Sequence, residues 1–101
     1  MNSGQLVLVT LLNPKEKFWG ELLSLSPAGV SLRGVDLQSL DDFMQMVKSG
    51  EAAAGTMVFF PMHRVQRMEV DARSGELPSL SEQFTLKTGK DARKFFQEPP
   101  R

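Results

Sequence analysis

The stretch that most constrains the fold of this chain runs from Thr56 to Ala72 and reads TMVFFPMHRVQRMEVDA. It holds two apolar runs, and Pro61 stands between them with almost no polar loop. Proline cannot donate a hydrogen bond to a neighbouring strand, so within a sheet it belongs at an edge or a bend. We therefore predict two short strands, over about 56–62 and 64–71, that meet at the corner of a small, strongly bent barrel.

Three further strands are predicted ahead of this corner. Residues 5–12 (QLVLVTLL), 18–26 (FWGELLSLS) and 30–36 (VSLRGVD) are rich in aliphatic and β-branched side chains, and turn sequences with proline separate them. Gly20 and Gly34 interrupt the second and third runs, where a bulge or a tight bend is expected. Five strands in all predict a mainly β fold with a minor α content.

The hydrophobic period changes to that of a helix after residue 38. A helix of about nine residues is predicted as an insert over about 39–50, with Ser39 as its N-cap. Its apolar face carries Leu40, Phe43, Met44 and Val47. A capping box of Ser79 and Glu82 opens a second helix that extends to about Thr88, and residues 91–96 form a further short helix.

The length of 101 residues suits a single hydrophobic core. We expect a barrel over residues 1–73, a helical extension over 74–96 and a disordered tail over 97–101. Twelve basic residues balance twelve acidic ones, whereas domains that depend on phosphate contacts usually carry a basic excess. The chain has no cysteine, which fits a cytoplasmic protein, and its apolar run near the N-terminus is too short to span a membrane.

The candidates for chemistry are few. His63, Arg64, Arg67 and Arg73 form a mildly basic stretch around the second of the two strands at the predicted corner, and His63, Arg64 and Arg67 could contact the phosphates of RNA, although a solvated outer face interrupted by acidic residues is the simpler interpretation. Asp41 and Asp42 are explained by the helix dipole better than by a metal ion. No nucleophile motif, phosphate loop or ligand cluster is present, so we expect neither catalysis, nor a cofactor, nor a metal.

Aromatic side chains exceed what one inward face of a small barrel can hold. Trp19 lies in the second predicted strand, and two phenylalanine pairs follow, Phe59-Phe60 and Phe95-Phe96. We predict that some of them pack under a helix or against another subunit, and that at least one pair takes part in an interface.

The order of these elements resembles the Sm-like (LSm) family, which includes bacterial Hfq, over about residues 5–71. The first part of the resemblance is LVLVTLLNPKEKFWGEL, with Asn13 at the turn and Phe18, Gly20 and Leu22 in the expected order. The second is Phe59-Phe60, a corner of Pro61-Met62-His63, and then Val65 and Met68. The resemblance implies a five-stranded, strongly bent Sm-like or SH3-like open barrel that forms homo-oligomers through its fourth and fifth strands. The implied interface residues are Val58, Phe59, Phe60, Pro61, Met68 and Val70.

Two departures from the family bear on function. RNA-binding members carry polar base-binding residues in the second hairpin and at the corner, where this chain has Ser26-Pro27-Ala28-Gly29-Val30 and Pro61-Met62-His63. The helical insert and the C-terminal helices also differ from the minimal family member. Two hypotheses follow: an oligomeric Sm-like protein that binds RNA through His63, Arg64 and Arg67, or an Sm-like scaffold without a nucleotide pocket that binds other proteins.

Overall fold

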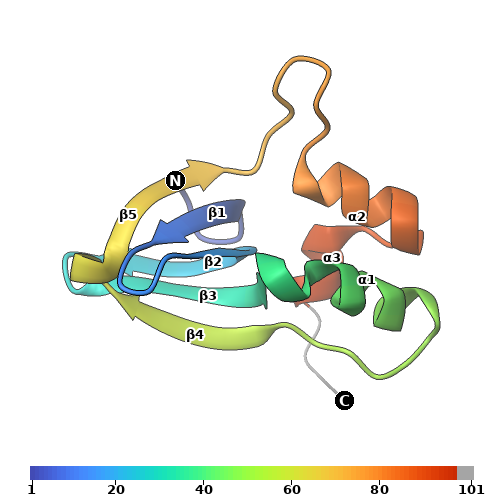
Figure 1. Cartoon of the computed structure of the whole chain (residues 1–101), viewed down its shortest axis with the longest axis horizontal. Helices are drawn as coiled ribbons and strands as arrows, with labels where there is room; N and C mark the ends of the chain where they lie inside the picture. The colour runs from blue at the N-terminus through green and yellow to red at the C-terminus, as the bar shows by residue number, and fades with distance from the viewer. Residues whose placement is uncertain (98–101) are drawn as a thin grey trace.

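The structure, a computed structural model, describes residues 1–97 and shows a five-stranded antiparallel sheet with three α-helices (Figure 1). The strands are β1 (Leu6–Leu11), β2 (Glu16–Ser26), β3 (Gly29–Asp36), β4 (Thr56–Pro61) and β5 (Val65–Val70). They lie in the order β4-β3-β2-β1-β5, so the last two strands of the chain form the two edges of an open sheet. The predicted mainly β architecture and its five strands are confirmed.

Successive side chains of a strand point to opposite faces of the sheet, and each face here has its own hydrophobic cluster. We call one the inner cluster; its buried members are Val7, Val9, Leu11, Phe18, Leu22, Val30, Leu32 and Phe60. We call the other the outer cluster; its buried members are Trp19, Leu40, Phe43, Met44, Val47, Phe84, Ala92 and Phe96. The outer cluster lies where the three helices gather beside one end of the sheet (Figure 1).

The backbones of β2 and β3 approach each other closely where Gly20 lies opposite Gly34. A Cβ atom on either glycine would overlap backbone atoms of the other strand, so only glycine fits at both positions. The strand register stays regular at this point and shifts instead between Leu22 and Ser24. Of the two alternatives predicted for Gly20, the bulge is wrong, and a close approach of two backbones is observed.

The insert helix is α1 (Leu40–Lys48), and its nine residues and apolar face agree with the prediction. Ser39 occupies the N-cap position as predicted, but its side chain makes no capping hydrogen bond. A short 3-10 turn, η1 (Leu37–Ser39), precedes the helix, and the Asp36 side chain caps this turn by accepting from the Gln38 backbone N–H at 2.7 Å. The side chain that caps the start of this helical segment is therefore that of Asp36, three residues before the predicted cap Ser39.

Two helices follow β5, namely α2 (Leu80–Thr88) and α3 (Ala92–Gln97). The predicted capping box is present: the Ser79 hydroxyl accepts from the Glu82 N–H at 3.1 Å, and the Glu82 carboxylate accepts from the Ser79 N–H at 2.9 Å. The rings of Phe84 and Phe96 lie 5.8 and 5.1 Å from that of Trp19, measured between centroids. Trp19 is fully buried beneath these helices, as predicted for part of the aromatic surplus.

The C-terminal helices share the outer cluster with β2, so they pack directly on the sheet. The predicted division into residues 1–73 and 74–96 stays a prediction. Gln97 ends α3, and the remainder of the predicted disordered tail, 98–101, lies outside the described residues. Across residues 1–97, no helix has both the length and the apolar character needed to cross a membrane.

Candidate functional site

The corner between β4 and β5 is the 3-10 turn η2 (Met62–Arg64), and Arg64 attaches it to the turn between β1 and β2. Its guanidinium donates from Nε to the Leu12 carbonyl at 3.0 Å and from Nη2 to the Pro14 carbonyl at 2.9 Å. Nη2 also lies 2.9 Å from the Glu16 carboxylate. A guanidinium that is paired and hydrogen-bonded in this way stabilises the corner, and little of its hydrogen-bonding capacity is left for a phosphate.

The other two residues of the predicted basic site do not join Arg64 in one pocket. His63 is exposed at the tip of η2, and Arg67 points from the middle of β5, where it forms an ion pair with Glu69. The structure therefore places the three residues along one segment of chain and neutralises two of them. This arrangement matches the solvated, acid-interrupted face that was the simpler interpretation of the sequence.

The outer edge of β4 is open among the described residues, because β4 pairs only with β3. The Met62 N–H donates to the Ala28 carbonyl at 2.9 Å, and in an antiparallel ladder every second residue bonds toward the same neighbour. The backbone groups of Met57 and Phe59 therefore point away from β3, toward the open edge. Pro61 points the same way but has no N–H to donate.

The outer edge of β5 is open in the same sense, since β5 pairs only with β1 within residues 1–97. The Asp71 N–H donates to the Leu6 carbonyl at 2.9 Å, which sets the alternation along the strand. The backbone groups of Met68 and Val70 consequently point outward. Each edge strand thus offers outward-pointing backbone groups for pairing with another chain.

The predicted interface residues differ in what they expose. Phe60 is buried in the inner cluster, and Val58 and Met68 pack against it. Phe59 and Val70 are 54% and 44% exposed. Met57, which the sequence analysis did not assign to the interface, is 63% exposed; it lies on the same face of β4 as Phe59, so strand alternation alone would have identified it.

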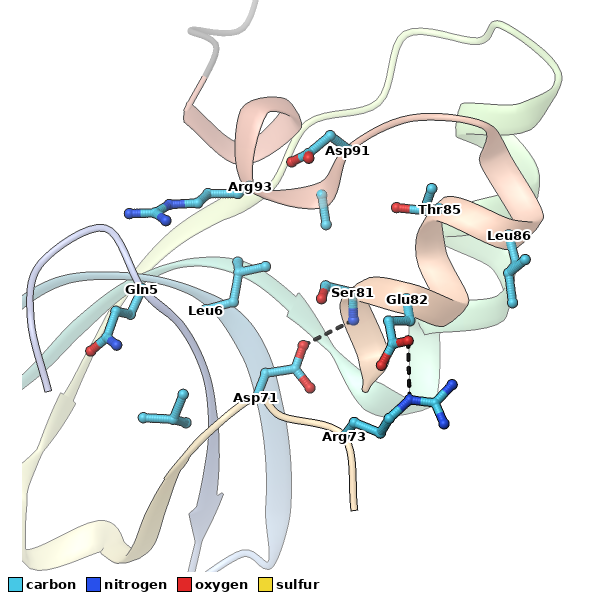
Figure 2. A pocket seen from close by; sticks show the side chains of 12 residues that line it. Gln5, Leu6, Asp71, Arg73, Ser81, Glu82, Thr85, Leu86, Asp91 and Arg93 are labelled. Carbon is cyan, nitrogen blue, oxygen red and sulfur yellow. Dashed lines mark hydrogen bonds and ion pairs between the residues drawn. The ribbon is translucent and has the colours of Figure 1, made fainter. Parts of the chain in front are cut away.

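An open groove of about 670 Å³ lies beyond the ends of β1 and β5, against α2 and α3 (Figure 2). Leu6, Val70 and Asp71 line it from the sheet, and Leu86 and Arg93 line it from the helices. No local pattern in the sequence indicated this groove, because its walls come from segments that are far apart along the chain.

The N-terminus of α2 at the edge of this groove is occupied by a carboxylate of the chain itself. Asp71 accepts from the backbone N–H groups of Leu80 and Ser81 at 2.9 Å each and from Trp19 Nε1 at 3.1 Å. Beside it, the hydrogen bond from the Ser79 N–H lowers the pKa of the Glu82 carboxyl, and the charge of Arg73 lowers it further. The positive end of the helix dipole is therefore already compensated, and Asp71 joins α2 to the end of β5.

Neither a cluster of metal ligands nor a related protein indicates what this site does. Within residues 1–97, no three His, Asp or Glu side chains lie together in a way that could hold a metal ion. Comparisons with protein-family models, with curated proteins and with solved structures find no match to this chain.

Proposed function

We propose that this chain is an Sm-like, non-catalytic assembly protein whose copies join head to tail, the open edge of β4 pairing with the open edge of β5 on the next copy. One observation carries the proposal. The residues whose backbone groups point out of each edge also bear exposed or half-buried apolar side chains, Met57 and Phe59 on β4 and Met68 and Val70 on β5. An open apolar strand edge is a template for pairing with another chain unless something covers it.

The side chains favour antiparallel pairing of the two edges. In an antiparallel ladder, directly opposed residues that exchange hydrogen bonds have side chains on one face, so Met57 faces Val70 and Phe59 faces Met68. In a parallel ladder, Met57 and Phe59 would instead lie on the same face as the ion pair of Arg67 and Glu69. The antiparallel arrangement joins apolar to apolar side chains and leaves the ion pair in water.

This pairing joins two different surfaces of the same molecule. A head-to-tail contact of this kind makes a closed ring when the rotation between copies closes, and a filament when it does not. Pro61 lacks the N–H that the next step of the ladder requires, so we expect pairing to stop at the corner. Assembly through β4 and β5 also removes both edges, which otherwise promote aggregation.

RNA binding is the alternative, and the contacts at the corner make it the weaker one. Arg64 and Arg67 are each paired with a carboxylate, at Glu16 and Glu69. Only His63 is exposed there without a partner among the hydrogen bonds and ion pairs of the described residues. We therefore favour a scaffold that binds protein, and a shift of single-stranded RNA by the protein at low salt would reverse this preference.

The mass of the protein in solution tests the proposal. The wild-type chain should sediment as a multiple of 11.3 kDa, and Phe59→Asp should shift it toward the monomer. Phe59 is 54% exposed, and burial of that part of an aromatic side chain, about 100 Å², contributes roughly 2.5 kcal/mol, or close to 100-fold in the dissociation constant.

Leu25→Asp is the matched control, because Leu25 is 50% exposed but lies on β2, where it pairs with Val30 of β3 and stands outside the two edge strands of the proposed contact. The control should leave the mass unchanged. A wild-type protein that stays monomeric at the highest soluble concentration would overturn the proposal, as would equal effects of the two substitutions.

A further inference from the structure

We propose that the connector between α1 and β4, residues 51–55 (EAAAG), docks into the groove beside β5 of the next copy. The inference rests on the head-to-tail assembly proposed above and names the occupant of the groove that the C-terminal helices create. Each copy would then place the connector that follows its α1 against the C-terminal helices of its neighbour.

The groove and the open edge of β5 are continuous. Val70 has outward-pointing backbone groups at the end of β5, and its side chain also lines the groove. Asp71 and Arg73 extend the same wall beyond the strand, Glu82 on α2 pairs with Arg73, and Arg93 on α3 lies at the other side of the groove, above Gln5 (Figure 2). A strand added to this edge would therefore point one of its ends at the groove.

The antiparallel register decides which end that is. With Met57 of one copy opposite Val70 of the next, the start of β4 lies beside the end of β5. Three residues before Met57 is Ala54, and three residues after Val70 is Arg73, so these two residues lie opposite each other if both segments stay extended. At about 3.3 Å per residue, the connector from Glu51 to Gly55 reaches some 15 Å past β4, alongside the wall of the groove.

The connector has the chemistry of a docking segment. Ala52 and Ala54 are exposed and small, so they fit against another backbone without a clash. Ala53 and Gly55 are turned inward, Ala53 packing on the outer cluster and Gly55 lying next to the ring of Phe96. Docking through the outward alanines would leave those contacts in place.

Disulfide trapping tests the inference directly, since the chain has no cysteine of its own. Ala54→Cys and Arg73→Cys are made as separate proteins, mixed, and oxidised at low concentration. The expected product is a covalent heterodimer that forms at least tenfold faster than the product of Ala54→Cys with Lys90→Cys, an exposed control on the turn between α2 and α3. A bond within one copy is excluded, because each protein carries a single cysteine.

The outcomes separate the two proposals. Rapid trapping at 54 and 73 that Phe59→Asp abolishes supports both. An oligomer that sediments normally but does not trap faster at Arg73 than at Lys90 overturns the docked connector and leaves edge pairing intact. A monomeric wild-type protein overturns the head-to-tail assembly and the docked connector together.

Discussion

Phe84 on α2 is the ring that joins the helices to the sheet, and its removal tests whether both form one cooperative unit. The side chain is fully buried, and four aromatic rings from three other elements surround it. Centroid distances are 5.8 Å to Trp19 on β2, 6.4 Å to Phe43 on α1, and 5.6 and 6.3 Å to Phe95 and Phe96 on α3. Phe84→Ala would therefore leave a cavity where β2 and all three helices meet.

The expected loss is large for a chain of this size. Truncation of a buried phenylalanine to alanine costs about 3–5 kcal/mol, and the lost aromatic pairs put this site near the upper end. Because the entropy of unfolding is about 2.1 cal/mol/K per residue, 1 kcal/mol lowers the Tm of a 101-residue chain by roughly 5 °C. We expect Phe84→Ala to lower the Tm by about 20 °C, or to leave the protein unfolded at room temperature when the wild-type stability is near 5 kcal/mol.

Thermal and urea unfolding can be followed by the fluorescence of Trp19, the single tryptophan, whose ring centroid lies 5.8 Å from that of Phe84. Leu86→Ala is the control on the same helix, since Leu86 is 82% exposed and should change the stability by less than about 0.5 kcal/mol. Phe84→Leu should fall between the two and keeps the test usable if the alanine variant does not fold. A Phe84→Ala protein that unfolds within about 2 °C of the wild type would refute the cooperative packing of helices and sheet.

Two further predictions concern stability. Gly34→Ala should destabilise the protein by about 3 kcal/mol or more in urea unfolding, because the new Cβ would overlap the Trp19 carbonyl and the Gly20 Cα; a loss near zero would contradict the close approach of β2 and β3. The capping box should make stability depend on pH. The Ser79 N–H lowers the pKa of Glu82 below its ordinary 4.5, so this contribution is complete above pH 4.5 and is lost as the pH falls through the lowered value. Glu82→Gln should therefore be less stable than wild type at pH 7, and urea unfolding at pH 3 should show a smaller difference; a constant difference would disprove the assignment.

Much of the local structure was predictable because its causes are local. Strand alternation, the helical period of α1 and the capping box at Ser79 depend on residues a few positions apart, and the structure has them where the sequence predicted. Ser39 stands at the predicted N-cap without a side-chain hydrogen bond, and Asp36 caps a 3-10 turn that precedes the helix, which is also a local arrangement.

The candidate site was less predictable, because it depends on which groups are satisfied within the fold. Arg64 looked available for phosphate in the sequence, yet its guanidinium binds carbonyl groups and a carboxylate 48 to 52 residues earlier in the chain. Phe59 and Phe60 looked equivalent as interface residues, and the pleat of β4 separates them into one exposed and one buried ring. Met57 was not predicted as an interface residue, although it lies on the same face of β4 as Phe59.

By itself, the sequence determined the number and order of the elements, the corner at Pro61 and the need for some aromatic rings to pack outside the sheet's inner face. The tertiary structure alone decided that β4 and β5 form the open edges, that the helices cover Trp19 and that they build a groove at the end of β5. The physical reason is the range of the interactions. Hydrophobic periods and turn chemistry act over a few residues, whereas an open edge, a paired guanidinium and a groove exist only after distant segments have come together.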